Sequence, residues 1–454
     1  MVQKKKVSGN PEPPETGVLK HPKHFYGRIH ILVKNRLWLQ VIIALILGIL
    51  AGLLIGPSFG LIDTDLSKLI GEWASIPGIL FLKIIQIVVV PLIFVSIIIG
   101  LVGARDLKQL KKIGLIFVVY LIFTTAIAVG IAILLATTIK PGLYVSADSF
   151  DLEGNENLSS DISAFSMPDF KDLPSLIDSF FPTNLFGSIV HGELLSIVFF
   201  AIIIGISLLI LRKNKSRPLI SVLSSVQGVC MIIIKWAMLI VPIAVFGMMV
   251  KLTSGFGIST LVGLGSYVMT VLLGLFALIC VYLILVFIFA KITPLDYLKK
   301  IKDAQLLAFS TSSSAVVMPL SMKVSEEKLG VRPSIAEFII PTGAVINMNG
   351  TALYQVIAII FLAQVFGISL GITSLLVLSF LVIGASIGTP SVPGAGIAVL
   401  AMILTGLGIP TLGIILILGV DRILDMSRTT VNVTGDLTAS VIIDRTIKED
   451  ASPK

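Results

Sequence analysis

The sequence predicts an all-α integral membrane protein, and three observations carry that prediction. Of the 454 residues, 56% are apolar and only 13% are charged, whereas soluble domains carry about 25% charged residues. The mean hydropathy of +1.03 points the same way. Several uninterrupted apolar segments are also long enough to cross a bilayer as helices, which takes roughly 20 residues. This composition excludes a soluble enzyme and a disordered chain.

Six apolar segments are the predicted spans of the first two thirds of the chain. They are residues 37–58, 78–103, 113–138, 186–211, 220–251 and 261–290. A polar, basic segment, 1–36, precedes them, and it lacks the apolar core and cleavage site of a signal peptide. Both cysteines lie inside apolar segments, so no disulfide framework is expected.

The connections between these spans alternate in charge. Segments 104–112, 212–217 and 291–303 are basic, whereas 141–184 is acidic. The positive-inside rule places the basic connections in the cytoplasm and the acidic loop outside. This predicts a multi-pass protein of the cell membrane with both termini in the cytoplasm. The net charge of +8 then reports orientation, and no nucleic-acid partner is expected.

The C-terminal third departs from simple spanning helices. Segments 304–323 and 370–408 each place two apolar arms around a polar tip, at 310–314 and 388–396. In a membrane this pattern predicts a re-entrant hairpin whose tip lines a cavity or binds a ligand. A hydrated serine-rich linker is the alternative for 310–314, but its flanks are apolar.

Segment 335–366 is predicted to be a helix interrupted at its middle. Asn347, Asn349 and Gly350 lie near its centre, and the glycine alone costs about 1 kcal/mol relative to alanine in a helix. An unwound turn there would direct backbone carbonyls toward a cation, as in discontinuous transporter helices. A packing glycine at a helix crossing is the alternative.

The last span, 413–443, carries the strongest functional signal. At 3.6 residues per turn, one stripe of this helix contains polar and charged side chains only. Its members are Asp421, Asp425, Arg428, Asn432 and Asp436. Ionisable residues inside a membrane are functional candidates. The structural alternative is that Asp425 and Arg428 only neutralise each other at i, i+3. Arg422 lies about 100° away from Asp421 around the helix and is not assigned to the stripe.

The chemistry of this stripe fits an acidic amino acid. A carboxylate such as Asp425 binds an ammonium group, and a guanidinium such as Arg428 grips a carboxylate. Serine hydroxyls and backbone N–H groups of a hairpin tip would meet the second carboxylate. A buried anionic ligand also needs accompanying cations, for which Asp436 and carbonyl oxygens are suitable ligands.

Residues 304–443 resemble the glutamate/aspartate transporter family, the dicarboxylate/amino acid:cation symporters. Four blocks carry the resemblance: the serine-rich first hairpin, 347–351, the second hairpin from Ala385 to Gly396, and Asp421 to Asp436. The similarity extends over about 30–445. It implies eight transmembrane helices, two re-entrant hairpins, inverted repeats and an elevator-type homotrimer.

The resemblance also implies a division of the transmembrane region, 37–445. The scaffold would comprise about 37–103 and 186–252, and the transport domain about 113–140 and 261–445. A cytoplasmic tail, 446–454, would follow. The second hairpin would be the extracellular gate.

The resemblance further assigns ligand-binding roles to matched positions. Arg428 would hold the substrate's side-chain carboxylate and Asp425 its amino group. The other implied substrate residues are Ser313, Ser314, Thr351, Val392, Gly396, Thr429 and Asn432. The implied sodium ligands are Gly343, Asn347, Asn432 and Asp436 at one site, Ser386, Ile387 and Thr389 at a second, and Thr124, Thr125, Asn347 and Asn349 at a third.

Three positions depart from the family pattern. Asn349 replaces the aspartate usual in sodium-coupled members, which puts the third sodium ion in doubt. Pro390 and Ser391 replace a more flexible pair at the second tip. This chain also lacks the extra arginine that relatives carry at the position of either Ser312 or Met426.

The resulting hypothesis is a secondary active symporter for aspartate or glutamate, with no enzymatic activity and no cofactor besides the coupling ion. Retention of Asp436 favours sodium over protons. The alternatives are a proton-coupled glutamate symporter of the same fold, an ion channel, and a receptor that binds an amino acid without moving it.

Overall fold

The computed structural model describes most of the chain between residues 37 and 447. The described residues are 37–56, 59, 61–102, 107–145, 187, 194–391, 393–407, 409–410 and 413–447, apart from some side chains within them. Within these ranges the regular secondary structure is entirely helical, as predicted. The basic segment 1–36 and almost all of the acidic loop 141–184 and the tail 446–454 lie outside the described residues.

Five long helices contain the six predicted spans. They are α2 (Leu37–Ile55), α3 (Thr64–Val102), α4 (Leu107–Ile139), α8 (Leu194–Ile210) and α9 (Lys213–Leu285). A 3₁₀ turn, η1 (Pro141–Tyr144), follows α4. The first four helices overlap their predicted segments, and the ends differ by up to 14 residues at the start of α3.

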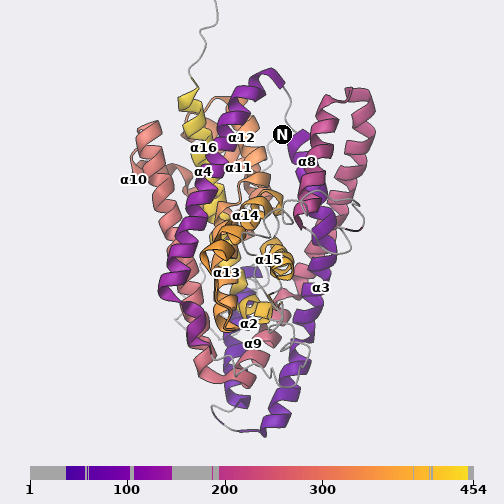
Figure 1. Ribbon diagram of the computed structural model, residues 1–454, viewed down its shortest axis with the longest axis vertical. Helices are drawn as coiled ribbons and strands as arrows, with labels where there is room; N and C mark the ends of the chain where they lie inside the picture. The colour runs from indigo at the N-terminus through magenta and orange to yellow at the C-terminus, as the bar shows by residue number, and fades with distance from the viewer. Residues whose placement is uncertain are drawn as a thin grey trace, which may run out of the picture.

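Helix α9 is the main departure from the predicted elements, because it joins two predicted spans without a break. Its 73 residues include 252–260, a connection with no proline and no charged residue to end a helix. The helix turns at the bottom of Figure 1, so that its two halves rise along opposite sides of the molecule. The halves Asn214–Gly255 and Leu261–Ala290 are each long and apolar enough to cross a membrane.

The helices of the C-terminal third are interrupted at the predicted positions, but the first of them begins at Pro294, within the segment 291–303 that was predicted to be a connection. They are α10 (Pro294–Thr311), α11 (Ser314–Lys323), α12 (Pro333–Ile346), α13 (Asn349–Val365), α14 (Ile372–Gly388), α15 (Ala395–Gly406) and α16 (Ile414–Thr446). Two π-helical turns, η4 (Val286–Ala290) and η5 (Val324–Lys328), follow α9 and α11. The pair α10–α11 meets at Ser312 and Ser313, and α14–α15 meets across 389–394.

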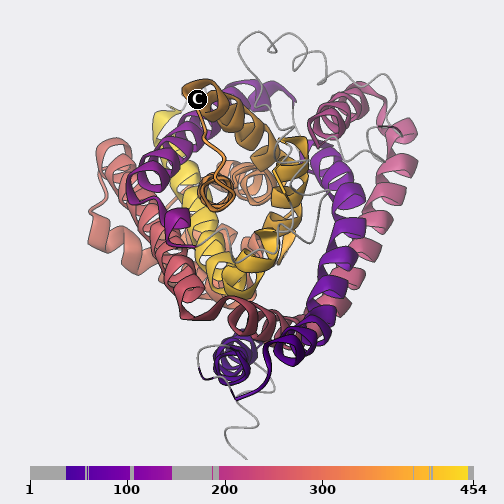
Figure 2. The same cartoon turned by 60° about the horizontal axis from the view of Figure 1, so that its bottom comes forward.

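Helices α13 and α16 occupy the centre of the molecule, and α3, α4 and α9 surround them (Figure 2). Almost every residue of α13 is buried. The outer helices instead expose large apolar side chains, such as Trp73, Ile87 and Leu239, which are 69–75% exposed. An apolar exterior of this extent suits a lipid environment.

Small residues allow the outer helices to pack closely. Gly247 of α9 lies directly against the backbone carbonyl of Ala74 in α3, where an added Cβ would collide with the oxygen. At one end of the molecule, the top of Figure 1, lie the end of α3 and the starts of α4, α9 and α10. The connections predicted to be basic and cytoplasmic therefore share one end.

Candidate functional site

The Arg428 guanidinium lies at the centre of the candidate site. The residue is 2% exposed, and its Cζ lies 4.4 Å from the centroid of the Tyr354 ring, within the range of a cation–π contact. A Cβ added to Gly396 would lie 2.5 Å from the guanidinium atoms. The planar cation therefore contacts both an aromatic ring and a bare backbone.

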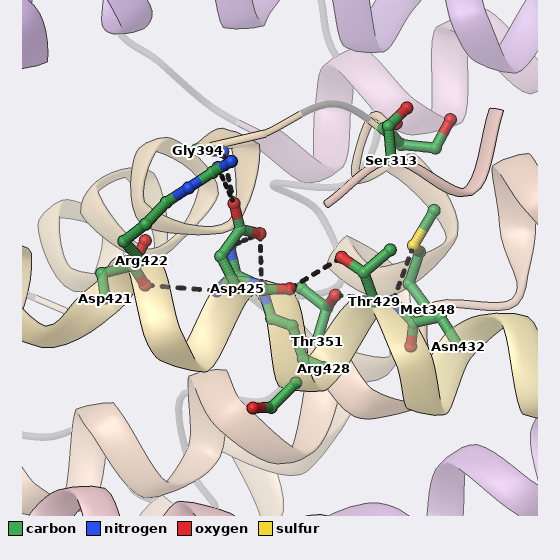
Figure 3. Close-up of polar contacts among 12 residues, drawn as sticks. Ser313, Met348, Thr351, Gly394, Asp421, Arg422, Asp425, Arg428, Thr429 and Asn432 are labelled. Atoms are coloured by element: carbon green, nitrogen blue, oxygen red, sulfur yellow. Dashed lines mark hydrogen bonds and ion pairs between the residues drawn. The ribbon is translucent and has the colours of Figure 1, made fainter. Parts of the chain in front are cut away.

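The Asp425 carboxylate connects this arginine to the second tip (Figure 3). Its Oδ1 accepts from Arg428 Nη2 at 2.8 Å and Nε at 3.2 Å. Its Oδ2 accepts from Arg422 Nη1 at 3.2 Å and from the Gly394 backbone N–H at 3.1 Å. A carboxylate offers about four acceptor sites, so all of them are occupied here.

A small pocket lies beside this ion pair. Its lining includes seven of the nine sequence-predicted substrate residues: Ser314, Thr351, Gly396, Asp425, Arg428, Thr429 and Asn432. Ser313 contributes indirectly, because its hydroxyl donates to the Ser391 carbonyl at 2.7 Å; Val392 lies outside the described residues. The pocket measures about 10 Å³, and a cavity of roughly 10–15 Å³ accommodates one water molecule. The site is therefore closed, and an amino acid enters only if the tips separate.

Backbone conformation shapes both tips. Ser312 ends α10 in the left-handed region, with φ +52°, which frees Ser313 to adopt an extended conformation before α11. Gly394 has φ +80°, a region that glycine enters without steric cost. This conformation aims its N–H at Asp425.

A much larger cavity adjoins the closed pocket. It measures about 550 Å³ and lies between α3 and α9 on one side and α11 and α12 on the other. Pro390 and Ser391 line both this cavity and the small pocket. The second tip is therefore the wall between the two spaces.

The interruption of the α12–α13 helix lies against another buried acidic residue, Asp436 of α16. Asn347 and Met348 leave helical geometry, and Asn347 Nδ2 donates to Asp436 Oδ1 at 2.9 Å. A Cβ on Gly343 would lie 2.5 Å from that carboxylate oxygen. Asp436 is 2% exposed, and within the described chain no lysine or arginine forms an ion pair with it.

Asn432 links this region to the small pocket. Its Oδ1 accepts from the Gly350 backbone N–H at 2.7 Å, and its Nδ2 donates to Thr351 Oγ1 at 3.1 Å and approaches the Met348 sulfur at 3.3 Å. The predicted ligands Gly343, Asn347 and Asp436 are thus in contact, while Asn432 turns toward the pocket.

Asn349 and the two threonines of α4 form a separate buried cluster. Thr125 donates to Asn349 Oδ1 at 2.6 Å. Asn349 Nδ2 donates at 2.9 Å to both Thr124 Oγ1 and the Tyr282 hydroxyl. Tyr282, which was not predicted as a site residue, is fully buried within a predicted apolar span.

Ser386, Ile387 and Thr389 lie at the C-terminal end of α14. Backbone carbonyls at a helix end lack intrahelical partners and carry the negative end of the helix dipole. Here the Ser386 carbonyl accepts a long hydrogen bond of 3.4 Å from Thr389 N–H, and Thr389 Oγ1 donates to the Ala385 carbonyl. The Ile387 side chain is outside the described part of the chain.

The structure adds Arg422 to the site, which the sequence analysis left out. The 100° offset around the helix describes where the Cβ points, whereas residues at i and i+3 are surface neighbours on a helix. The long Arg422 side chain therefore reaches the Asp425 carboxylate. Met348, Pro390 and Ser391 also line the pocket without having been predicted as ligands.

Comparison with known proteins finds symporters over most of the chain. The family model described as "Sodium:dicarboxylate symporter family" matches residues 37–446. A proton/sodium-glutamate symport protein of Bacillus subtilis (strain 168) is 34% identical, covering 91% of this chain and 93% of its own. A proton/glutamate-aspartate symporter of Escherichia coli (strain K12) is 32% identical, covering 90% and 93%.

A third relative has a different name. The C4-dicarboxylate transport protein of Bacillus subtilis (strain 168) is 31% identical, covering 92% of this chain and 95% of its own. All three align over nearly their whole length. The chain belongs to the sodium:dicarboxylate symporter family and is therefore a transporter and not an enzyme.

Proposed function

We propose that this protein takes up aspartate or glutamate together with a cation, and that the substrate binds between Asp425 and Arg428. The ion pair between these two side chains carries the proposal. In the closed pocket each residue neutralises the other at 2.8 Å. An amino acid with a second carboxylate offers both of them a replacement: an ammonium group for Asp425 and a carboxylate for Arg428.

Binding would then be an exchange of ion pairs. Arg428 leaves Asp425 Oδ1 and grips the substrate's side-chain carboxylate, while the substrate's ammonium takes the acceptor sites that Arg428 leaves. Two buried charges remain paired throughout, which matters because an uncompensated buried charge costs several kcal/mol. The remaining α-carboxylate would meet Ser314, Thr351 and the second tip.

The same exchange favours an amino acid over a dicarboxylate that lacks the amino group. A dicarboxylate would draw Arg428 away but would supply no donor to Asp425 Oδ1. Leaving a buried charged acceptor unsatisfied carries the full desolvation penalty. Of the three relatives described above, two are named for glutamate and one for C4-dicarboxylates, and Asp425 together with Arg428 supports the first group.

Asp436 supports coupling to a cation. Its buried carboxylate has one amide donor and no ion-pair partner in the described chain. A sodium ion held by Asp436, Asn347 and the Gly343 carbonyl would supply the missing positive charge, since such ions prefer oxygen ligands. We propose sodium as the coupling ion. The alternative is a proton on the same carboxylate, and the uptake experiment below distinguishes the two.

We propose a second sodium site at the end of α14 and no third one. The backbone carbonyls of Ser386, Ile387 and Thr389 would hold the second ion. At the third position, Asn349 directs its own amide donors at the oxygens of Thr124 and Tyr282. These oxygens therefore already have hydrogen-bond donors, so the position does not need a cation.

We further propose that transport is an elevator movement within a homotrimer. The scaffold would comprise about 37–103 and 186–252, and the transport domain 113–140 and 261–445, with α10–α11 and α14–α15 as the re-entrant hairpins. The 550 Å³ cavity has α3 and α9 on one side and α11 and α12 on the other. This position supports a separation of the two parts along the same boundary. The cavity would serve as the route toward the end of the molecule predicted to face the cytoplasm.

Uptake into liposomes tests the proposal. Purified protein should accumulate radiolabelled aspartate or glutamate against its gradient when sodium is high outside. Arg428→Ala should lose this uptake and still elute as folded protein, whereas Arg445→Ala, which removes an exposed arginine of the same helix, should keep it. Acidic amino-acid uptake that survives Arg428→Ala would refute the substrate assignment. Uptake driven equally by a proton gradient without sodium would reassign the coupling ion.

A further inference from the structure

Arg422 has no role in the proposed exchange, yet its side chain is only 8% exposed and its guanidinium contacts Asp425. The surrounding wall is largely apolar: Arg422 borders a cavity of about 20 Å³ that is also lined by Phe81, Met238 and Val241. Its Nε is buried without a hydrogen-bond partner in the described chain. A buried donor left unsatisfied costs about 1–3 kcal/mol, so stability alone does not account for an arginine at this position.

The geometry of Asp425 suggests what Arg422 does. Arginine and carboxylate normally pair through two parallel hydrogen bonds, one to each oxygen. Arg428 instead places both Nε and Nη2 on the single oxygen Oδ1. The other oxygen, Oδ2, is held by Arg422 Nη1 and by the Gly394 N–H. Figure 3 shows the Arg422 guanidinium reaching along the helix to this carboxylate beside Gly394.

We propose that Arg422 is a positioning residue that keeps Asp425 out of the two-oxygen pair with Arg428. This inference rests on the proposed function, in which substrate must break the Asp425–Arg428 pair. By holding Oδ2, Arg422 keeps that internal pair incomplete and therefore easier for a substrate to replace. It also keeps Oδ2 turned toward Gly394, so that the second tip stays closed over the pocket.

The charges in the cluster agree with this role. Arg422 and Arg428 balance Asp421 and Asp425, and Arg428 Nη1 lies 3.4 Å from Asp421 Oδ1. Without Arg422 the cluster carries one net negative charge, and Asp425 is free to rotate and offer both oxygens to Arg428. The internal pair then strengthens, Gly394 loses its acceptor, and an anionic substrate meets a less favourable field.

Arg422→Met is the decisive variant, because an apolar chain of similar length suits the apolar wall around this position. Arg422→Gln serves if that variant does not fold. Arg422→Lys keeps a positive charge near Oδ2 and should restore function in large part. Arg445→Met, on the exposed surface of the same helix, is the matched control.

Two measurements test the proposal. The first is the KM for aspartate in liposomes, which should rise about tenfold in Arg422→Met, the equivalent of about 1.4 kcal/mol, with a smaller change in kcat. The second is the rate at which a polar thiol reagent modifies Ser314→Cys in detergent without substrate, after Cys230 and Cys280 are replaced by alanine. Ser314 is 3% exposed and lines the closed pocket, so modification of a cysteine at this position reports opening of the tip. In Arg422→Met this modification should be several-fold faster than in the Arg445→Met control.

The two measurements also separate the two proposals. Equal modification rates in Arg422→Met and Arg445→Met, or an unchanged KM, would overturn the role given to Arg422. If the unmodified protein accumulates no acidic amino acid, the proposed function fails, and the thiol measurement still decides whether Arg422 holds the tip.

Discussion

Asp436→Asn tests the proposed cation site directly, because it removes one buried charge and almost nothing else. The asparagine side chain has the same shape, and it can keep the contact with Asn347 if its carbonyl takes the place of Oδ1. In the present structure that carboxylate is 2% exposed and accepts one amide hydrogen bond at 2.9 Å. An ionised group in this setting costs several kcal/mol unless a cation compensates it. Sodium should therefore stabilise the unaltered protein and have little effect on the variant.

The size of the effect follows from mass action. A ligand that binds only the folded state at a hundredfold excess over its Kd raises the free energy of unfolding by about 2.7 kcal/mol. We expect a sodium-dependent stabilisation of this order in the unaltered protein and close to zero from this site in Asp436→Asn. In sodium-free buffer the variant should be at least as stable as the parent, because the uncompensated charge is gone.

Thermal unfolding in detergent, followed by the fluorescence of the three tryptophans, measures both quantities. Choline chloride at equal concentration controls for ionic strength, which screens exposed charges. A variant that retains the full sodium-dependent rise in melting temperature would refute the reasoning, since the ion would then bind elsewhere. An unaltered protein that responds to pH and not to sodium would point to a proton on Asp436.

Three further substitutions have definite expected outcomes. Asn349→Asp should lower the melting temperature in sodium-free buffer by exposing the interior to a new charge, and should steepen the sodium dependence of uptake by creating a third site. Gly396→Ala should abolish aspartate binding in a titration, because the new methyl group would lie 2.5 Å from the Arg428 guanidinium. Gly247→Ala should instead destabilise the fold without altering KM, because the Cβ would collide with the Ala74 carbonyl, and neither residue lines the small pocket.

The periodicity of the sequence was sufficient to predict most elements of the fold. The polar stripe of α16 is buried along its whole length, and the α12–α13 helix is interrupted at Asn347 and Met348. Both features were predictable because they follow from local chemistry: charged residues in an apolar segment, and poor helix formers. The continuous α9 was not predicted. Hydropathy marks where a chain becomes less apolar, and this change does not require a helix to end. Segment 252–260 contains no proline and no charged residue, and the helix continues through its glycine, serine and threonine residues.

The candidate site was predictable in its membership but not in its connections. Spacing around a helix places Asp425 and Arg428 together, whereas the reach of Arg422 depends on side-chain rotamers that no periodicity encodes. Tyr282 lies in an apolar segment where it looks like an ordinary buried aromatic residue. Its hydrogen bond to Asn349 joins residues 67 positions apart, and such a contact is set by tertiary packing.

The shared wall formed by Pro390 and Ser391 limits how this protein can change. The same two residues line the proposed substrate pocket and border the 550 Å³ cavity. A side chain that loosens this wall to hasten departure of the bound molecule also weakens its retention, so turnover and affinity cannot be tuned independently here. Proline stiffens the backbone at this point, which resists loosening of the wall.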